Sequence, residues 1–303
     1  MAIEIRQVLG YEDLSRWVAT RDEIGPDVAT VEMTALLRAT EVEHVDLLAL
    51  VDGEPAGTAF ISGDPRSVES RKPYFEVSVT ERHRGKGVGS ALLTAVRDHA
   101  LTLGYVALRC SAREDHPGSV EFLERHGFTV TRRTHELTLR LHASPTPARG
   151  APDDVDIDWL GDRPELLTGM YEVAREAAAH RPDFAAGFVR SETGWRIYEL
   201  GSPHVRFDLT ALALAGSSVR GYAIAQDVPG AETVYHRAMA LAPDRQDTGL
   251  GEALVAAQIE QARAAGGESL VALPWDTGVE RLFQGLGYEP GTPWLELEAP
   301  LTR

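Results

Sequence analysis

Three glycines alternate with other residues in RGKGVGS (84–90), where a β-branched run gives way to a helical pattern. Glycine has no Cβ, so a ligand can approach its backbone closely and left-handed backbone angles are open to it. A strand that ends in such a loop and leads into a helix presents unpaired N–H groups beside the positive end of the helix dipole. Two basic side chains and a hydroxyl could add charge-assisted hydrogen bonds. The segment therefore predicts a pyrophosphate site, formed by Arg84, Gly85, Lys86, Gly87, Val88, Gly89 and Ser90.

The spacing of the glycines excludes two common nucleotide-binding loops. The dinucleotide-binding pattern G-x-G-x-x-G and the phosphate-binding pattern G-x-x-x-x-G-K-[ST] are both absent. A simple tight turn without a ligand is the remaining alternative to a pyrophosphate site. The surrounding pattern must decide between the two.

The elements around the loop recur in a second half of the chain. Alternating runs and 3–4 spacings predict a strand, two helices, a hairpin at Asp52-Gly53, the strand YFEVSV, a long helix, a strand, a short helix and closing strands. The second half repeats this order, with its hairpin around Gly216. Gly87 matches Gly249 at an offset of 162, which indicates an internal duplication. The fold class expected is α/β, with two tandem units, each a mixed, mostly antiparallel twisted sheet flanked by helices.

The two predicted domains are separated by HASPTPARGAPDD, which is rich in proline and small residues and has no apolar periodicity. The expected boundaries are 1–141 for the first domain, 142–154 for the linker and 155–303 for the second domain.

Composition limits the class of partner and compartment. The net charge of −16 makes nucleic acid a poor partner, because binding it requires basic residues that neutralise phosphates. No apolar run is long enough to span a membrane, and the N-terminus lacks the features of a signal peptide. The single cysteine excludes an intramolecular disulfide and a cysteine-rich zinc site. A reduced, cytoplasmic setting without a bound metal is the expectation.

The run Arg84-x-x-Gly87-x-Gly89, its preceding strand and the later SVEFLERHGF (119–128) resemble the GNAT superfamily of N-acetyltransferases. The family signature is Arg/Gln-x-x-Gly-x-Gly/Ala, and the resemblance covers nearly all of residues 3–141. It implies that acetyl-CoA is the acyl donor and that the loop holds its pyrophosphate. It further implies a pantetheine arm along the preceding strand and beside the later helix. The residues implied beside that arm are Val77, Ser78, Val79, Ser119 and Phe122.

The catalytic residues are less clear, because the tyrosine that often protonates the leaving thiolate in this family is Leu123 here. His116, at a position that is frequently asparagine, is one substitute, since a histidine suits acid–base work; water is another. Glu76 is the leading candidate for the base that deprotonates the amine, because carboxylates are depleted in apolar strands. Its alternative role is to attract the amine without taking a proton. Asp22, Glu23 and Asp27 either shape the acceptor pocket or form a solvated loop.

The second copy keeps a variant of the signature, Gln246-x-x-Gly249-x-Gly251, but Asp247 and Thr248 replace Gly85 and Lys86. A carboxylate near a pyrophosphate costs about 1 kcal/mol or more even in a solvated setting. The second copy is therefore expected to have lost acetyl-CoA binding. The tandem layout is also similar to that of mycothiol synthases, which would place the active copy second, whereas the two loops favour the first.

The function expected is transfer of an acetyl group to a primary amine of a small or antibiotic-like cationic acceptor, by direct attack in a ternary complex. The alternatives are a non-catalytic acyl-CoA-binding or regulatory protein, and acetylation of protein amines. Residues 151–303 carry twice as many acidic as basic residues, which favours a cationic acceptor or only a soluble surface. A homodimer is an expectation at the level of the family. The acceptor itself and the length of the acyl group are open.

Overall fold

The computed structural model describes residues 2–25, 30–40, 43–63, 71–143, 150–180, 191–274 and 277–301. It divides into two compact units: unit 1 holds the described residues of Met1–Arg132 and Leu295–Arg303, and unit 2 holds those between Arg133 and Trp294. The predicted linker, 142–154, falls partly outside the described residues.

The described residues of the first repeat form ten helices and strands besides the short 3-10 helix η2 (Glu81–His83), and the last of these is the long strand β6. In chain order these are β1 (Ile3–Gln7), α1 (Tyr11–Ile24), α2 (Val31–Thr40), β2 (Val45–Val51), β3 (Glu54–Ser62), β4 (Tyr74–Val79), α3 (Val88–Thr102), β5 (Ala107–Arg113), α4 (Pro117–Arg125) and β6 (Thr129–Arg140). Strands β1 to β4 are antiparallel neighbours, and β4 pairs with β5 in parallel.

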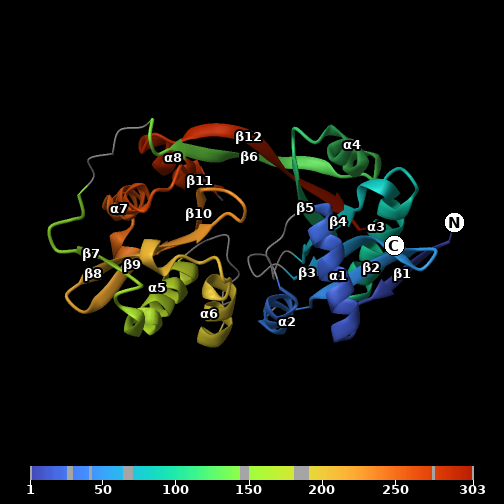
Figure 1. The fold of residues 1–303 in the computed structure, drawn as a ribbon, viewed down its shortest axis with the longest axis horizontal. Coiled ribbons are helices and arrows are strands. Elements are labelled where there is room, and N and C mark those ends of the chain that lie inside the picture. Colours follow the sequence, from blue (N-terminus) through green and yellow to red (C-terminus); the bar gives the residue numbers. More distant parts are fainter. Residues whose placement is uncertain are drawn as a thin grey trace. The chain divides into compact units, whose positions relative to one another are not determined.

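The second repeat follows the same plan (Figure 1). Its elements are β7 (Asp156–Trp159), η3 (Pro164–Leu166), α5 (Leu167–Ala179), α6 (Glu192–Leu200), η4 (Phe207–Leu209), β8 (Ala211–Ala215), β9 (Ser218–Asp227), β10 (Thr233–Leu241), η5 (Pro243–Arg245), α7 (Leu250–Ala264), β11 (Ser269–Ala272), α8 (Thr277–Gly285) and β12 (Glu289–Pro300). Strands β7 to β10 are antiparallel neighbours and β10 pairs with β11 in parallel, so the predicted fold class is confirmed.

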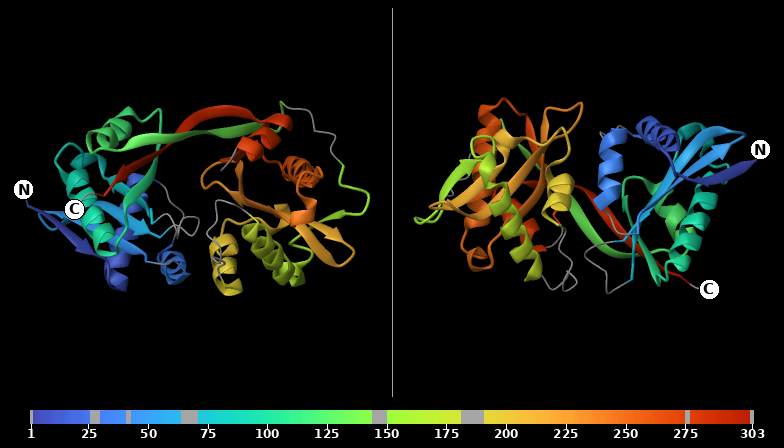
Figure 2. Two further views of the ribbon diagram at one scale, coloured as in Figure 1. Left: turned by 180° about the vertical axis from the view of Figure 1, so that it is seen from behind. Right: turned by 90° about the horizontal axis from the view of Figure 1, so that it is seen from below.

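Both faces of each sheet are covered by helices (Figure 2). In β2, Leu47, Ala49 and Val51 pack in the core that contains α3, whereas Leu48 and Leu50 pack against α1. Successive side chains of a strand point to opposite faces, so this near-continuous apolar run is buried on both sides. In unit 2 the same alternation places β8 between α5 and α7.

The closing strands of the two repeats are exchanged between the units. In the strand order of the sheet, β4-β5-β12-β6-β11-β10, β12 lies next to β5 and β6 lies next to β11. The last part of β12, from Leu295, lies in unit 1, and Arg133–Arg140 of β6 lie in unit 2. Leu297 is fully buried in the core of α3, and Leu139 is fully buried beside α7 and pairs with Leu270 of β11. Sequence periodicity predicts these strands but not their partners.

This exchange predicts a crossed effect of two core substitutions. Leu297→Ala, in the second repeat, should destabilise unit 1, and Leu139→Ala, in the first repeat, should destabilise unit 2. Each leaves a cavity that costs about 2–5 kcal/mol. Hydrogen exchange followed by mass spectrometry, resolved over α3 and α7, measures the loss of protection in each unit. Loss of protection confined to the repeat that carries the substitution would contradict the exchange.

Candidate functional site

The glycine loop of unit 1 adopts a conformation that only glycine reaches easily. Gly85 and Gly87 have φ of 71° and 86°, in the left-handed region. Gly87 is the N-cap of α3, and no side chain caps that helix. Because the first N–H groups of a helix have no partner within it, the first turn of α3 keeps donors for an anion at its positive end. The predicted loop therefore has the backbone geometry that a phosphate site requires.

Two polar side chains of the loop are engaged by the protein itself. Arg84 Nε donates to the carbonyl oxygen of Val79, at 3.2 Å, which fastens the loop to the end of β4. His126 Nδ1 lies 2.7 Å from the carbonyl oxygen of Phe122 and must donate to it. In a neutral His126 the other nitrogen, Nε2, is then an acceptor, and it lies 3.2 Å from Ser90 Oγ. The Ser90 hydroxyl thus donates to His126.

Strands β4 and β5 diverge beyond a single ladder position, Tyr74 opposite Arg109. The backbone groups of Val77 and Val79 on the β5 side therefore have no ladder partner on β5, and the side chains of both residues pack on the core shared with α3. Phe122, on α4, also packs against that core, and its ring lies 3.5 Å from where a Cβ on Gly89 would stand. The structure thus brings the predicted loop, the end of β4 and Phe122 of α4 together where β4 and β5 diverge.

Glu76 lies on the other face of β4, toward α1. Its Oε1 is 3.0 Å from Arg21 Nη1 and accepts a hydrogen bond from Ser78 Oγ at 3.1 Å. The Arg21 guanidinium lies over the rings of Trp17 and Phe60, at 5.0 and 5.7 Å from their centroids. Sequence reasoning missed Arg21 as the partner of Glu76. The only local signal was its position beside Asp22 and Glu23, in the segment expected to shape the acceptor pocket.

Tyr74 is a second residue that the sequence did not single out. It shares the Glu76 face of β4, since the two residues are two positions apart. Burial, followed by the nearby Glu76 charge, raises the pKa of Tyr74 to about 12. Its phenol therefore stays protonated at neutral pH and is available as a hydrogen-bond donor.

The remaining sequence candidates lie in different surroundings. His116 is the exposed N-cap of α4, with Nε2 4.0 Å from Asp115 Oδ1, and its carbonyl accepts from the N–H of Ser119. Leu123, at the usual tyrosine position, is buried in the core of unit 1. Glu23 lies 3.5 Å from Arg82. Asp27 is outside the described residues.

The loop of unit 2 repeats the backbone of unit 1 almost angle for angle. Gln246 has φ −66° and ψ 145°, against −63° and 150° for Arg84. Gly249 has φ 82°, and Asp247 takes the left-handed place of Gly85 with φ 59°. Aspartate tolerates this region better than most residues. The second loop therefore keeps the backbone turn of the first, but it carries a carboxylate in place of the basic side chains.

The gap between β10 and β11 is largely filled. These strands pair from Thr233 to His236 and then diverge. The space between them is about 20 Å³, roughly enough for one water, and among its lining residues are His236, Phe283 and Met239. The His236 ring lies 5.0 Å from the ring of Phe283, and its Nε2 is 2.5 Å from Tyr288 Oη. The rings of His236, Phe283 and Tyr288 thus pack against one another beside this space.

A β-bulge interrupts β10 between His236 and Ala238, whereas β4 pairs with β3 in continuous register. Bulges often lie next to active sites, where they re-aim a side chain. Here the re-aimed side chain is Arg237, whose guanidinium donates to the carbonyls of Tyr198 and Glu199. Both carbonyls belong to the last turn of α6, where a cation is favourable. The bulge thus directs Arg237 to the C-terminal end of α6 in unit 2.

Comparison with known proteins identifies the family. Residues 13–128 and 169–288 each match the acetyltransferase (GNAT) family, so the match covers most of the chain and both repeats. The chain belongs to the GNAT family. It is an N-acetyltransferase built from two GNAT domains.

Two curated relatives are named mycothiol acetyltransferase. That of Stackebrandtia nassauensis is 28% identical over 227 residues, 70% of each chain, and that of Pseudarthrobacter chlorophenolicus is 25% identical over 275 residues, 84% of this chain and 80% of the relative. The solved tandem GNAT protein from the clavulanic acid biosynthesis pathway covers 100% of this chain and 99% of its own, with a TM-score of 0.72 and 16% identity. A GCN5-related N-acetyltransferase from Sphaerobacter thermophilus covers 99% and 96%, with a TM-score of 0.63 and 18% identity. The solved structures support the GNAT fold.

Two further findings concern the described residues only. None of their helices has the length and hydropathy needed to cross a membrane. Their His, Cys, Asp and Glu side chains form no group of three that could hold a metal ion.

The buried histidine of the second GNAT domain predicts a pH-dependent stability. Burial lowers the pKa of His236 from 6.5 to about 4. Between these values the unfolded chain binds a proton that the folded domain does not, so stability should fall as the pH drops from 6.5 to 4. The full loss is about 3 kcal/mol.

Chemical denaturation of the protein between pH 4 and 7 measures this loss, with hydrogen exchange over α7 assigning it to unit 2. His236→Gln should flatten the profile, and the control His180→Gln, at an exposed helix end, should leave it unchanged. A profile that stays equally steep in His236→Gln would contradict the assignment.

Proposed function

We propose that unit 1 binds acetyl-CoA on its glycine loop and transfers the acetyl group to a primary amine of a small, cationic acceptor. The observation that carries this choice is the pairing of left-handed glycines with basic side chains, Arg84 and Lys86, at the start of α3. The second loop has the same backbone but places Asp247 where a phosphate would lie. Its strand gap is also filled by aromatic side chains. Both features support the first copy as the working site.

In the proposed binding mode the first-turn amides of α3 hold the pyrophosphate, with Ser90 and the loop cations adding hydrogen bonds. The edge of β4 at Val77–Val79, which has no ladder partner on β5, carries the pantetheine arm, with Ser119 and Phe122 on α4 beside it. The strands diverge where that arm must enter, which supports the arrangement. Acetyl-CoA supplies the activated acyl group as a thioester.

The chemistry requires a neutral amine. Alkyl ammonium groups have a pKa near 10, so a base must take a proton before attack on the thioester carbonyl. We assign this step to Glu76. Arg21 and Ser78 both bind its Oε1, so the proposal gives proton transfer to Oε2. A backbone N–H of β4 stabilises the oxyanion. His116 or water then protonates the thiolate, since Leu123 cannot.

The acceptor class is inferred from charge and from the relatives. A net charge of −16 attracts cations and repels anionic acceptors. The two relatives named mycothiol acetyltransferase add mycothiol-related amines to the panel to be screened. Direct attack in a ternary complex requires no acyl-enzyme, and Cys110 is an unsuitable acyl carrier, because burial raises its pKa to about 12.

Calorimetric titration of acetyl-CoA into matched loop variants tests the choice of site. Gly87→Glu places a carboxylate and a strained residue on the first loop, and Gly249→Glu does the same on the second. We expect one site per chain, lost in Gly87→Glu and retained in Gly249→Glu. Loss only in Gly249→Glu would place the cofactor in unit 2, and no binding to the wild type would refute the proposal.

Steady-state kinetics of Glu76→Gln test the base. We expect kcat to fall by about 10²–10⁴, because general-base catalysis contributes that much, with the KM for acetyl-CoA unchanged. Glu12→Gln, which removes the same charge from the exposed first turn of α1, is the matched control. A rise in acceptor KM alone, with an unaltered pH–rate profile, would show that Glu76 only attracts the amine.

A further inference from the structure

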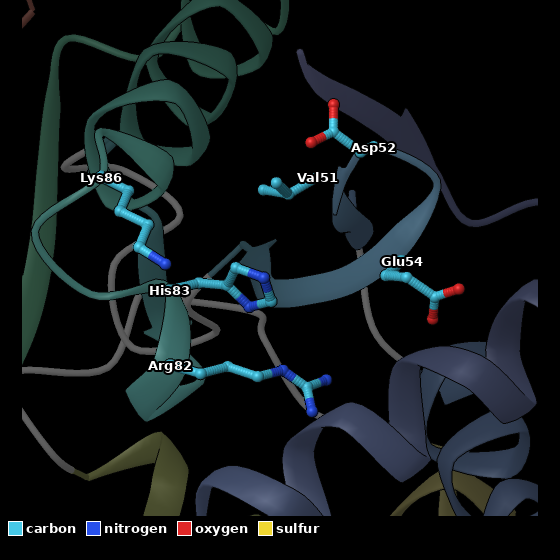
Figure 3. Close-up of a pocket in the computed structure, with 6 residues that line it drawn as sticks. All are labelled: Val51, Asp52, Glu54, Arg82, His83 and Lys86. Carbon is cyan, nitrogen blue, oxygen red and sulfur yellow. The ribbon is translucent and has the colours of Figure 1, made fainter. Parts of the chain in front are cut away.

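A second anion-binding feature lies beside the glycine loop of unit 1. A cavity of about 460 Å³ opens between the β2–β3 hairpin and the segment that runs from η2 into the loop (Figure 3). Its lining consists of Val51, Asp52, Glu54, Arg82, His83 and Lys86. Three of these six side chains are basic, and only Lys86 belongs to the pyrophosphate loop. The binding scheme above uses neither Arg82 nor His83.

Lys86 is directed into this cavity, with its ammonium group toward His83 (Figure 3). It forms no ion pair with any residue that the structure describes. Arg82 is held only at long range: its Nη2 lies 3.5 Å from both Glu23 Oε2 and the carbonyl oxygen of Pro55. Both cations therefore keep donors for a ligand.

The hydrogen bonds of His83 fix which of its nitrogens faces a ligand. The Thr80 hydroxyl donates to the carbonyl oxygen of Ala56, at 3.1 Å. Thr80 Oγ1 can then only accept from His83 Nδ1, at 2.8 Å. The proton on Nδ1 leaves Nε2 as the nitrogen of His83 that remains for a ligand.

The two acidic residues of the lining do not oppose this arrangement. Asp52 Oδ1 accepts from the N–H of Ala2 at 3.0 Å, which holds the carboxylate on the β1 side of the hairpin turn. Figure 3 shows the carboxylate of Glu54 pointing away from the side chains of Lys86 and His83. Of the two carboxylates, one is therefore held by a backbone N–H and the other is turned away from these two side chains.

The equivalent positions of unit 2 lack this property. At the offset of 162, Asp244, Arg245 and Thr248 stand at the places of Arg82, His83 and Lys86. Arg245 forms a bidentate pair with Asp154, at 3.0 and 2.6 Å, so its charge is already compensated. The basic cavity is therefore a feature of the copy whose loop also keeps its positive charge.

We propose that this cavity binds a phosphate monoester dianion, the 3′-phosphate on the ribose of CoA. The inference rests on the proposed placement of the pyrophosphate on the adjoining loop. A phosphate monoester carries almost two charges at pH 7 and three strong acceptor oxygens, which match the basic side chains of Arg82, His83 and Lys86 that line the cavity. In CoA this group is on the same nucleoside as the pyrophosphate, and Lys86 belongs to both the loop and the cavity wall. Free inorganic phosphate has the same chemistry and is the other source to test.

The test compares CoA with dephospho-CoA, which lacks only the 3′-phosphate, by calorimetry at pH 7. Because the cavity is open to solvent, we expect the wild type to prefer CoA by about tenfold. The double variant Arg82→Gln/His83→Gln should bind the two ligands equally, with its affinity for dephospho-CoA unchanged. Arg6→Gln removes an exposed positive charge outside the cavity and should retain the tenfold preference. Unchanged thermal melting of the variants shows that they fold.

The outcomes separate this inference from the proposed function. Equal binding of CoA and dephospho-CoA by the wild type, or a preference that survives in the double variant, overturns the 3′-phosphate site and leaves the proposed function standing. Failure of both ligands to bind the wild type refutes the proposed function and this inference with it.

Titration with inorganic phosphate tests the other possible source of the phosphate group. A phosphate that binds the wild type, is lost in the double variant and is not displaced by CoA would assign the cavity to free phosphate and overturn its assignment to CoA.

Discussion

The hydrogen-bonding edge of β5 is the constraint on which the first GNAT domain depends. Strand β5 must be paired on the side away from β4, because an open edge exposes unsatisfied N–H and C=O groups and a strip of core. That partner is β12, which the second repeat supplies, and its Leu295, Leu297 and Ala299 complete the apolar core beneath α3. Glu298 of the same strand binds Lys72, at 2.6 Å, just before β4 begins. The strand that carries Tyr74 and Glu76 is thus anchored by residues from the far end of the chain.

The exchange is reciprocal, so each repeat contributes strands to the core of the other unit. Leu137, Leu139 and Leu141 belong to the first repeat but lie in the core of unit 2, next to α7 and α8. Each core therefore draws on both repeats, and loss of either repeat would remove buried apolar surface from the other unit. The second loop keeps left-handed residues at Asp247 and Gly249 because the strand must still turn sharply into α7. Its side chains are under no such requirement, since the turn needs only the backbone.

Much of the fold and part of the site could be predicted from local pattern. Both hairpins, the main helices and the duplication follow from periodicity and from glycine placement, which are properties of adjacent residues. The exchange does not, because TVTRRTHELTLR has the same alternation whichever sheet it joins. The Arg21–Glu76 pair and the bulge at Arg237 depend on contacts between distant segments, so one sequence could not reveal them. The backbone conformation of the glycine loop was predictable because adjacent residues set it, whereas the surroundings of the catalytic candidates depend on neighbours that only folding brings together.

The environment of Glu76 limits the kind of acceptor that the proposed reaction can use. Arg21 lies against the rings of Trp17 and Phe60, so its guanidinium cannot leave the carboxylate without losing those contacts as well. An incoming ammonium group must therefore share the carboxylate with a fixed cation. That arrangement weakens the attraction of Glu76 for a positive charge and favours an amine that is already close to losing its proton. In the proposed mechanism the long-range charge of the protein concentrates the cationic acceptor, while Arg21 orients Glu76 for the proton transfer itself.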